Sequence, residues 1–237
     1  MLEIKNLSVS LGRKQLLKNI DLSVNDGARH LLRGSNGSGK TTLVQTIACG
    51  GRGKGHDYVI ESGGIIFNGA DISDLPTCER ARLGIFFGAQ HVPEIPGLSV
   101  TSFLKHSLTA HAESAGGKGQ DDIPALSAGE FFTRLTAARE RLSIPESWTA
   151  RSINVGFSGG EKKRLMFLHL LMLRPRLAIL DEPDSGVDAD TQQIFADIIM
   201  EMNAQKTSFL IISHQEKFTK MISPTQTTSL SDGKVMI

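Results

Sequence analysis

The chain has 237 residues, of which 40% are hydrophobic and 22% are charged, and its formal net charge at pH 7 is +1. This composition is typical of a globular protein with a sizeable core. The near-neutral charge argues against nucleic acid or anionic lipid as a partner. The longest apolar run, residues 165–173, is interrupted by His169 and is too short to cross a bilayer. The first residues read as a strand and not as a secretory signal. We therefore expect a cytoplasmic protein that binds no nucleic acid and has no direct membrane insertion.

The first third of the chain predicts mostly strands. Apolar residues recur through residues 4–9 and again through 20–24, which indicates an antiparallel hairpin with one buried face. After it we expect a strand over residues 28–33, a helix over 40–48, a flexible glycine-rich turn over 50–57, and strands over 63–68 and 83–87.

Residues 91–174 read as a helical insertion into an otherwise α/β chain. We expect a helix over residues 99–111 and an exposed, glycine-rich loop over 113–124. Ser127 and Glu130 form a capping-box pattern at the start of a further helix. The helix carries an apolar stripe that we assign to core packing; its members are Phe131, Leu135, Ala138 and Leu142.

After Ser158 the α/β pattern resumes. We expect a helix through residue 173, a buried strand over 177–180, a helix over 189–203, a strand over 207–212, a short helix, and a closing hairpin at Asp232-Gly233. The two cysteines, Cys49 and Cys78, are expected as reduced thiols.

A glycine-rich loop between the strand at 28–33 and the following helix matches the pattern G-x-x-x-x-G-K-[ST]. Glycines let backbone N–H groups approach a triphosphate closely, and the start of a helix adds the positive end of its dipole. In this pattern Lys40 reaches the β- and γ-phosphates, and the Thr41 hydroxyl ligates Mg²⁺. The residues expected to bind ATP here are Gly34, Ser35, Asn36, Gly37, Ser38, Gly39, Lys40, Thr41 and Thr42.

Two carboxylates, Asp181 and Glu182, end the apolar strand that begins at residue 177. They fall at the carboxyl edge of a parallel sheet, where ligands collect. Adjacent carboxylates near a phosphate repel each other unless a cation is present. We expect Asp181 to hold Mg²⁺ and Glu182 to act as the general base on the attacking water.

A second anion site is expected at Ser158, Gly159 and Gly160, where a good N-cap precedes bare amide groups at a helix start. A second such site is redundant within one chain. The economical explanation is a head-to-tail pair, in which this loop closes on the γ-phosphate held by another copy. Without its neighbours, the segment could equally be an ordinary capped helix.

These motifs occur in an order that resembles ATP-binding-cassette ATPases: the phosphate loop, Gln90, residues 158–161, residues 180–182, residues 185–188 and His214. The resemblance implies a single domain with a RecA-like P-loop core and an antiparallel β lobe (1–90 and 175–237) and a helical lobe carrying the signature motif (91–174). It also implies that Gln90 contacts Mg²⁺ and water, that residues 185–188 cross a dimer interface, and that His214 contacts the γ-phosphate.

Residues 94–99, 151–155 and 184–188 more narrowly resemble the SufC family, the ATPases of the SUF iron–sulfur cluster assembly system. This resemblance implies a soluble, Mg²⁺-dependent ATPase that forms an ATP-dependent homodimer and remodels a SufB/SufD-type scaffold protein. The chain departs from the family at residues 89–92, at Leu11, where an aromatic side chain is common, and at Pro183, which is closer to transporter cassettes. Two alternatives remain: the ATPase subunit of a membrane transporter, and a regulatory or repair cassette that acts on ribosomes or DNA.

Overall fold

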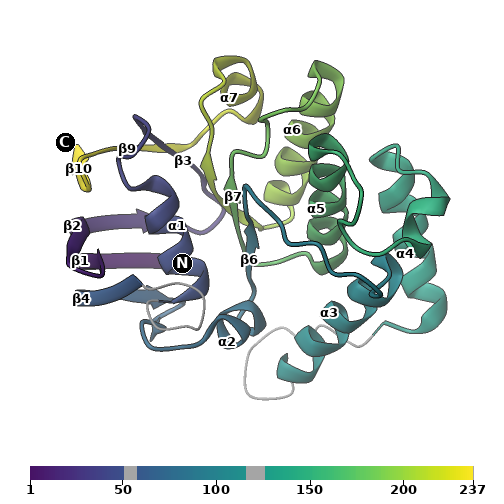
Figure 1. Ribbon diagram of the computed structural model, residues 1–237, viewed down its shortest axis with the longest axis horizontal. Helices are drawn as coiled ribbons and strands as arrows, with labels where there is room; N and C mark the ends of the chain where they lie inside the picture. The colour runs from purple at the N-terminus through teal and green to yellow at the C-terminus, as the bar shows by residue number, and fades with distance from the viewer. Residues whose placement is uncertain (51–57, 116–125, 237) are drawn as a thin grey trace.

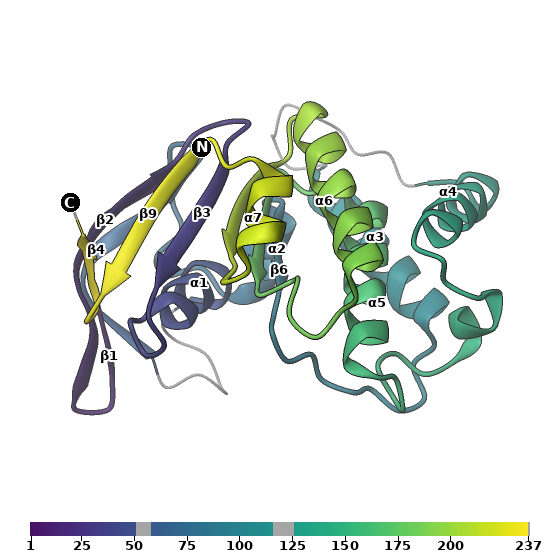
Figure 2. The same cartoon turned by 90° about the horizontal axis from the view of Figure 1, so that it is seen from above.

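The computed structural model describes residues 1–50, 58–115 and 126–236. Two sheets organise them (Figure 1). The antiparallel sheet has the order β2-β1-β4-β5, and the larger sheet has the order β10-β9-β3-β8-β7-β6. Figure 2 shows the antiparallel sheet at one end of the molecule, with α3, α4 and α5 at the other.

The antiparallel sheet comprises β1 (Leu2–Leu11), β2 (Lys14–Val24), β4 (Tyr58–Phe67) and β5 (Ala70–Asp71). The hairpin predicted over residues 4–24 is confirmed, because β1 pairs with β2 from Leu2↔Val24 to Leu11↔Lys14. Its apolar spacing departs from strict alternation between Ile4 and Leu7. The register shifts there, and Asn6 takes a positive φ of 49°, so both apolar side chains reach the core.

The larger sheet holds the predicted α/β strands: β3 (Arg29–Gly34), β6 (Ile85–Gly88), β7 (Leu177–Asp181) and β8 (Ser208–Ile212) run parallel, and β9 (Gln226–Ser231) and β10 (Lys234–Met236) form the closing hairpin. All five residues of β7 and of β8 are buried, as expected for strands covered on both faces. In β8, Leu210 packs into the core beside the antiparallel sheet, and Phe209 packs into the core of the helical side.

Helices cover both faces of this sheet. They are α1 (Lys40–Cys49), α2 (Thr77–Arg82), α3 (Val100–Ala115), α4 (Ala128–Arg141), the 3₁₀ turn η1 (Glu146–Ala150), α5 (Gly159–Leu173), α6 (Ala189–Ala204) and α7 (Glu216–Ile222). The capping box at Ser127 and Glu130 is present, and the predicted stripe that begins with Phe131 is buried.

Three local predictions differ from the structure. The helix expected to end at residue 111 continues to Ala115, because no glycine or proline stops it earlier. The strand expected from residue 63 begins at Tyr58, and the six-residue helix α2 was not predicted, since its polar sequence has no apolar periodicity. Residues 51–57 and 116–124, predicted as a turn and a loop, lie outside the described residues.

Candidate functional site

The glycine-rich loop connects β3 to α1, and α1 begins at Lys40, as the motif predicts. Gly34 and Gly39 have positive φ angles of 149° and 101°. A Cβ added to Gly34 would lie 2.3 Å from the Leu230 carbonyl oxygen, and one on Gly39 would lie 2.8 Å from the Leu17 side chain. At Gly34 the fixed backbone of Leu230 leaves no room for a Cβ, and at Gly39 the positive φ itself favours glycine because the Leu17 side chain could shift.

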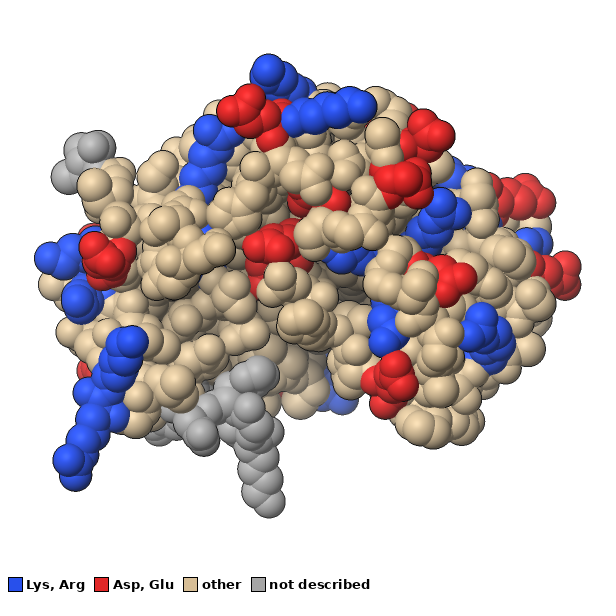
Figure 3. Space-filling model, turned by 45° about the horizontal axis from the view of Figure 1, so that its top comes forward, with Lys and Arg blue, Asp and Glu red and all other residues tan. Residues whose placement is uncertain are grey.

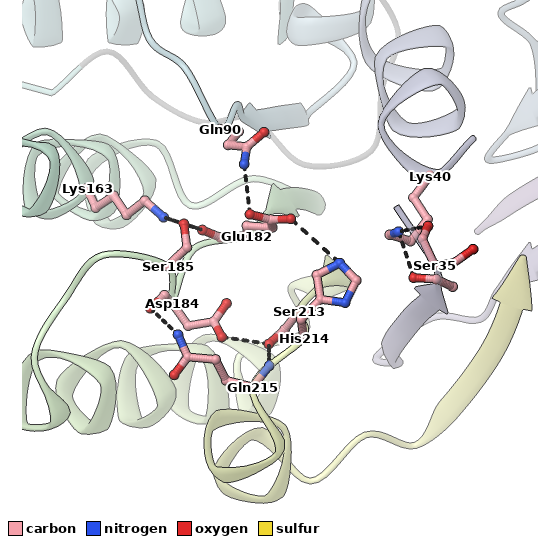
Figure 4. Close-up of polar contacts among 11 residues, drawn as sticks. Ser35, Lys40, Gln90, Lys163, Glu182, Asp184, Ser185, Ser213, His214 and Gln215 are labelled. Carbon is pink, nitrogen blue, oxygen red and sulfur yellow. Dashed lines mark hydrogen bonds and ion pairs between the residues drawn. The ribbon is translucent and has the colours of Figure 1, made fainter. Parts of the chain in front are cut away.

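Lys40 is buried beside the loop and donates to the carbonyl oxygens of Gly34 and Ser35, both at 2.8 Å (Figure 4). Burial lowers the pKa of the ammonium, and the charges of Glu182 and Asp181 oppose this shift. The buried hydroxyl of Ser38 has no hydrogen-bond partner within the described residues. A buried, orphaned donor beside a lysine fits the oxygen atoms of a phosphate.

Asp181 ends β7 and is only 3% exposed. Burial raises the pKa of its carboxyl, the charge of Glu182 raises it further, and the neighbouring Thr41 side chain lowers it. No group of three or more His, Cys, Asp or Glu residues in the described ranges forms a metal cluster. Mg²⁺ usually takes one or two carboxylates and fills its other positions with phosphate oxygens and water. The donors near Asp181 therefore fit Mg²⁺ bound together with a phosphate.

Glu182 lies between Gln90 and His214 (Figure 4). Gln90 Nε2 donates to Glu182 Oε2 at 2.7 Å, and His214 Nε2 lies 3.6 Å from Glu182 Oε1. The three residues follow the carboxyl ends of β6, β7 and β8, which are neighbours in the parallel sheet. Glu182 also has a positive φ of 51°, a conformation that a non-glycine residue adopts at a cost and often at functional sites.

Lys163, on the first turns of α5, reaches the same loop. Its Nζ donates to the backbone carbonyl of Glu182 and to Ser185 Oγ, the latter at 2.6 Å (Figure 4). Burial lowers the pKa of this ammonium, and the charges of Asp184, Glu182 and Asp181 oppose that shift. The sequence did not predict this contact, because a basic first turn of a helix normally faces solvent.

A buried network holds the segment after β8. Asp184 accepts from Ser213 Oγ at 2.7 Å through its side chain and from Gln215 Nε2 at 2.9 Å through its backbone. Gln192 Nε2 in turn donates to Gln215 Oε1 at 2.9 Å. Burial raises the pKa of Asp184, and the bond from Ser213 opposes this. His214 stands between the two residues that Asp184 holds, so the network fixes its position beside Glu182. Sequence reasoning also missed this network.

The residues of the predicted second anion site lie at the start of α5, which is capped as expected. Ser158 and Glu161 make a complete capping box, in which Ser158 N donates to Glu161 Oε2 at 2.7 Å and Glu161 N donates to Ser158 Oγ at 3.3 Å. Ser158 and Gly159 are exposed. Among the described residues no hydrogen bond joins residues 158–160 to the phosphate loop. A cavity of about 340 Å³ separates Gly159 from Gln90.

A phosphate loop between β3 and α1, with carboxylates at the end of β7, two strands away in the same parallel sheet, defines a P-loop nucleotide-binding protein. The sequence model of the ABC transporter family matches residues 17–185. The chain therefore belongs to the ABC transporter family, and it is an ABC ATPase.

The relatives that align with the whole chain are named either as probable ATP-dependent transporters or as probable ABC transporter ATP-binding proteins. The chain is 38% identical over 236 residues to the probable ATP-dependent transporter SufC of Escherichia coli, covering 100% of this chain and 91% of the relative. It is 37% identical to the probable ATP-dependent transporter ycf16 of Pyropia yezoensis, covering 100% and 90%. It is 36% identical to a probable ABC transporter ATP-binding protein of Streptococcus pyogenes serotype M3, covering 100% and 88%.

Solved structures agree on the fold. A dimeric ATP-binding cassette in a post-hydrolysis state with ADP and Pi superposes with a TM-score of 0.80 at 20% identity, covering 100% of this chain and 97% of that one. An ATP-binding subunit of an ABC transporter gives a TM-score of 0.82 at 22% identity, covering 100% and 88%. The predicted ABC ATPase fold is confirmed. Within the described ranges, no helix is both long and apolar enough to cross a membrane.

Proposed function

We propose that this chain is the ATPase of an iron–sulfur cluster assembly system, that it pairs on binding ATP, and that it remodels a SufB/SufD-type scaffold protein. The proposal that the chain acts on a scaffold protein rests on its similarity to Escherichia coli SufC, which extends over all of this chain. It is supported by a contact in the structure: the resembling stretches 94–99 and 151–155 hydrogen-bond to each other, with Ile153 N donating to Leu98 O at 2.8 Å. We also propose the division into a core and β lobe (1–90, 175–237) and a helical lobe (91–174).

In this proposal each residue of the site has one task. The loop from Gly34 to Thr42 and the Lys40 ammonium bind the phosphates. Thr41, Asp181 and Gln90 hold Mg²⁺, which when bound supplies positive charge to the β- and γ-phosphate oxygens. Ser158, Gly159 and Gly160 of a second copy cover the γ-phosphate, so that the two chains enclose two ATP molecules.

The hydrolytic step depends on Glu182. Its carboxylate accepts a proton from the attacking water as the water oxygen bonds to the γ-phosphorus. The bond from that phosphorus to the β–γ bridging oxygen breaks, and ADP and phosphate leave. Gln90 donates a hydrogen bond to the carboxylate from one side, and His214, on its other side, contacts the γ-phosphate in this proposal.

The test of this role is Glu182→Gln, which keeps the shape and the hydrogen bond from Gln90 but removes the base. We expect ATP turnover to fall by roughly 10²–10⁴-fold, with the dissociation constant for ATP nearly unchanged. Turnover is measured by phosphate release and binding by equilibrium titration. Glu216→Gln, on α7 outside the site, is the matched control. Turnover of the Glu182→Gln variant within a few-fold of the parent would reject Glu182 as the base.

The second candidate, the ATPase subunit of a membrane transporter, is favoured by the names of the Streptococcus relatives and by Pro183 after Glu182. The two candidates differ in the partner. Affinity purification from the native host under anaerobic conditions is expected to return soluble scaffold proteins of the SufB/SufD kind. Recovery of polytopic membrane proteins instead would favour the transporter.

A further inference from the structure

The segment over residues 151–157 leads directly into the second anion site at residues 158–160. It forms no helix and no extended strand, and two of its residues lie in the left-handed region: Asn154 with φ 65° and Gly156 with φ 67°. Asn and Gly are the residue types that adopt this conformation most readily, and Val155 N donates to Ser152 O at 3.2 Å, so the segment forms a tight turn. The direction in which the chain leaves this turn and enters α5 depends also on the contacts made by the side chains around it.

The first half of the segment is held by the stretch that follows Gln90. Ile153 N donates to Leu98 O at 2.8 Å, and Ile95 N donates to Ile153 O at 3.2 Å. Asn154 Nδ2 donates to Pro93 O at 2.8 Å. These bonds end at Asn154, and beyond it Val155 N donates to Ser152 O at 3.2 Å and Phe157 is buried in the core of the helical side.

Arg151 also contacts the last three residues before Ser158. Its Nη2 donates to the carbonyl oxygens of Val155 at 3.3 Å and Gly156 at 3.2 Å. Its guanidinium carbon lies 3.7 Å from the centre of the Phe157 ring, a close cation–π contact. The edge of Trp148 meets the same ring, with centroids 5.0 Å apart. One planar guanidinium thus bonds two carbonyls and packs against the ring next to Ser158.

We infer that Arg151 is a positioning residue for residues 158–160: it sets the direction in which their backbone N–H groups point. It touches no group of its own chain's phosphate site. The effect on hydrolysis rests on the proposed function, in which these N–H groups act on the nucleotide of a second copy. Lysine cannot replace it: both carbonyl bonds come from Nη2 alone and an ammonium could make them, but an ammonium lacks the flat face that packs on the Phe157 ring.

The first test uses the chain without nucleotide, so it does not depend on the proposed function. We expect amide hydrogen exchange at residues 156–161 to rise by about tenfold or more in Arg151→Ala and Arg151→Lys. The fluorescence of Trp148, the single tryptophan of the chain, should shift as well. Arg139→Ala is the matched control, because Arg139 also donates to a backbone carbonyl, that of Ile144 at 3.0 Å. Unchanged exchange in both Arg151 variants would overturn the inference.

The second test separates binding from turnover. With Mg·ATP, both Arg151 variants should bind nucleotide within about twofold of the parent, because the phosphate loop is intact. Their kcat and their ATP-dependent pairing should fall by about tenfold or more. Arg151→Lys decides the matter if Arg151→Ala fails to fold. Parent-like kcat and pairing in the lysine variant would overturn the catalytic part of the inference. A parent chain that never pairs on ATP would instead reject the proposed function, and the exchange measurement would still decide the role of Arg151.

Discussion

At the scale of single residues, Arg80 is the most constrained side chain outside the site. It is fully buried and donates four hydrogen bonds of 2.7–2.9 Å to backbone carbonyls, those of Thr46, Ile47, Ser73 and Leu75. Two of these carbonyls belong to the last turn of α1, where helix carbonyls begin to run out of intrahelical partners: that of Thr46 also accepts from Gly50 N at 3.1 Å, and that of Ile47 accepts from Arg80. Burial lowers the pKa of Arg80 to about 10, so it stays charged at pH 7. One guanidinium therefore joins the end of the phosphate-loop helix to α2.

We predict that Arg80→Met lowers the free energy of unfolding by about 3 kcal/mol or more, because it leaves several buried carbonyls without a donor. Arg80→Lys should recover little, since one ammonium cannot reach four carbonyls. The measurement is urea denaturation at pH 7. Arg82→Ala, two residues along the same helix, removes only an exposed pair with Glu79 and should change stability by less than about 1 kcal/mol. Equal effects of Arg80→Met and Arg82→Ala would contradict this account.

At the scale of elements, α5 packs an imidazole into its apolar face. The His169 ring meets Phe86 and Phe103 edge-on, with centroids 5.3 and 4.8 Å apart. Its Nε2 is buried without a hydrogen-bond partner in the described part of the chain. Burial lowers the pKa of His169 from 6.5 to about 4. The helix is therefore docked on the sheet with a neutral histidine.

The lowered pKa of His169 predicts that the protein loses stability as the pH falls. A histidine with a lowered pKa in the folded state stabilises fully above pH 6.5, and the stabilisation is lost as the pH falls toward 4. For His169 the free energy of unfolding falls by about 3 kcal/mol over this range. Burial lowers the pKa of His30 in the same direction. His169→Phe should keep most of the packing and flatten the decline in unfolding free energy between pH 6.5 and 4, measured by denaturant titration at each pH. A slope identical to that of the parent would refute the assignment.

At the scale of the whole molecule, the phosphate loop and the predicted second anion site lie beside different cores. The helices of the helical side share a core with one face of the larger sheet, and the phosphate-loop helix packs into the other core. Figure 3 shows acidic and basic side chains interspersed over one face, without a large region of a single sign. This face therefore offers little long-range charge attraction, and if two copies pair as proposed, we expect the enclosed nucleotide to supply the stabilisation.

We predict that the Glu182→Gln chain is monomeric alone and doubles its mass with Mg·ATP, measured by analytical ultracentrifugation. Because the variant hydrolyses ATP slowly, uncleaved ATP stays bound and completes the interface between the two copies. Lys40→Ala, which loses the phosphate contact, should stay monomeric under the same conditions. An unchanged mass of the Glu182→Gln chain at saturating ATP would count against shared sites.

The sequence by itself determined the parts whose information is local. A phosphate loop needs glycines and a lysine at fixed spacing, a capping box needs Ser127 and Glu130 three residues apart, and buried parallel strands need short apolar runs such as residues 177–180. Each of these is set by backbone geometry within a few residues. These local patterns could be predicted before the structure, and the resemblance of their order to ATP-binding-cassette ATPases implied the fold.

Only the tertiary structure decided the contacts that join distant segments. Lys163 bonds the loop at Glu182 and Ser185, and Arg80 reaches carbonyls more than thirty residues away on α1. In the sequence both look like ordinary surface cations, which solvent usually surrounds. Their roles arise because folding buries their charged groups beside backbone carbonyls, and such burial has no signature in the local residue pattern.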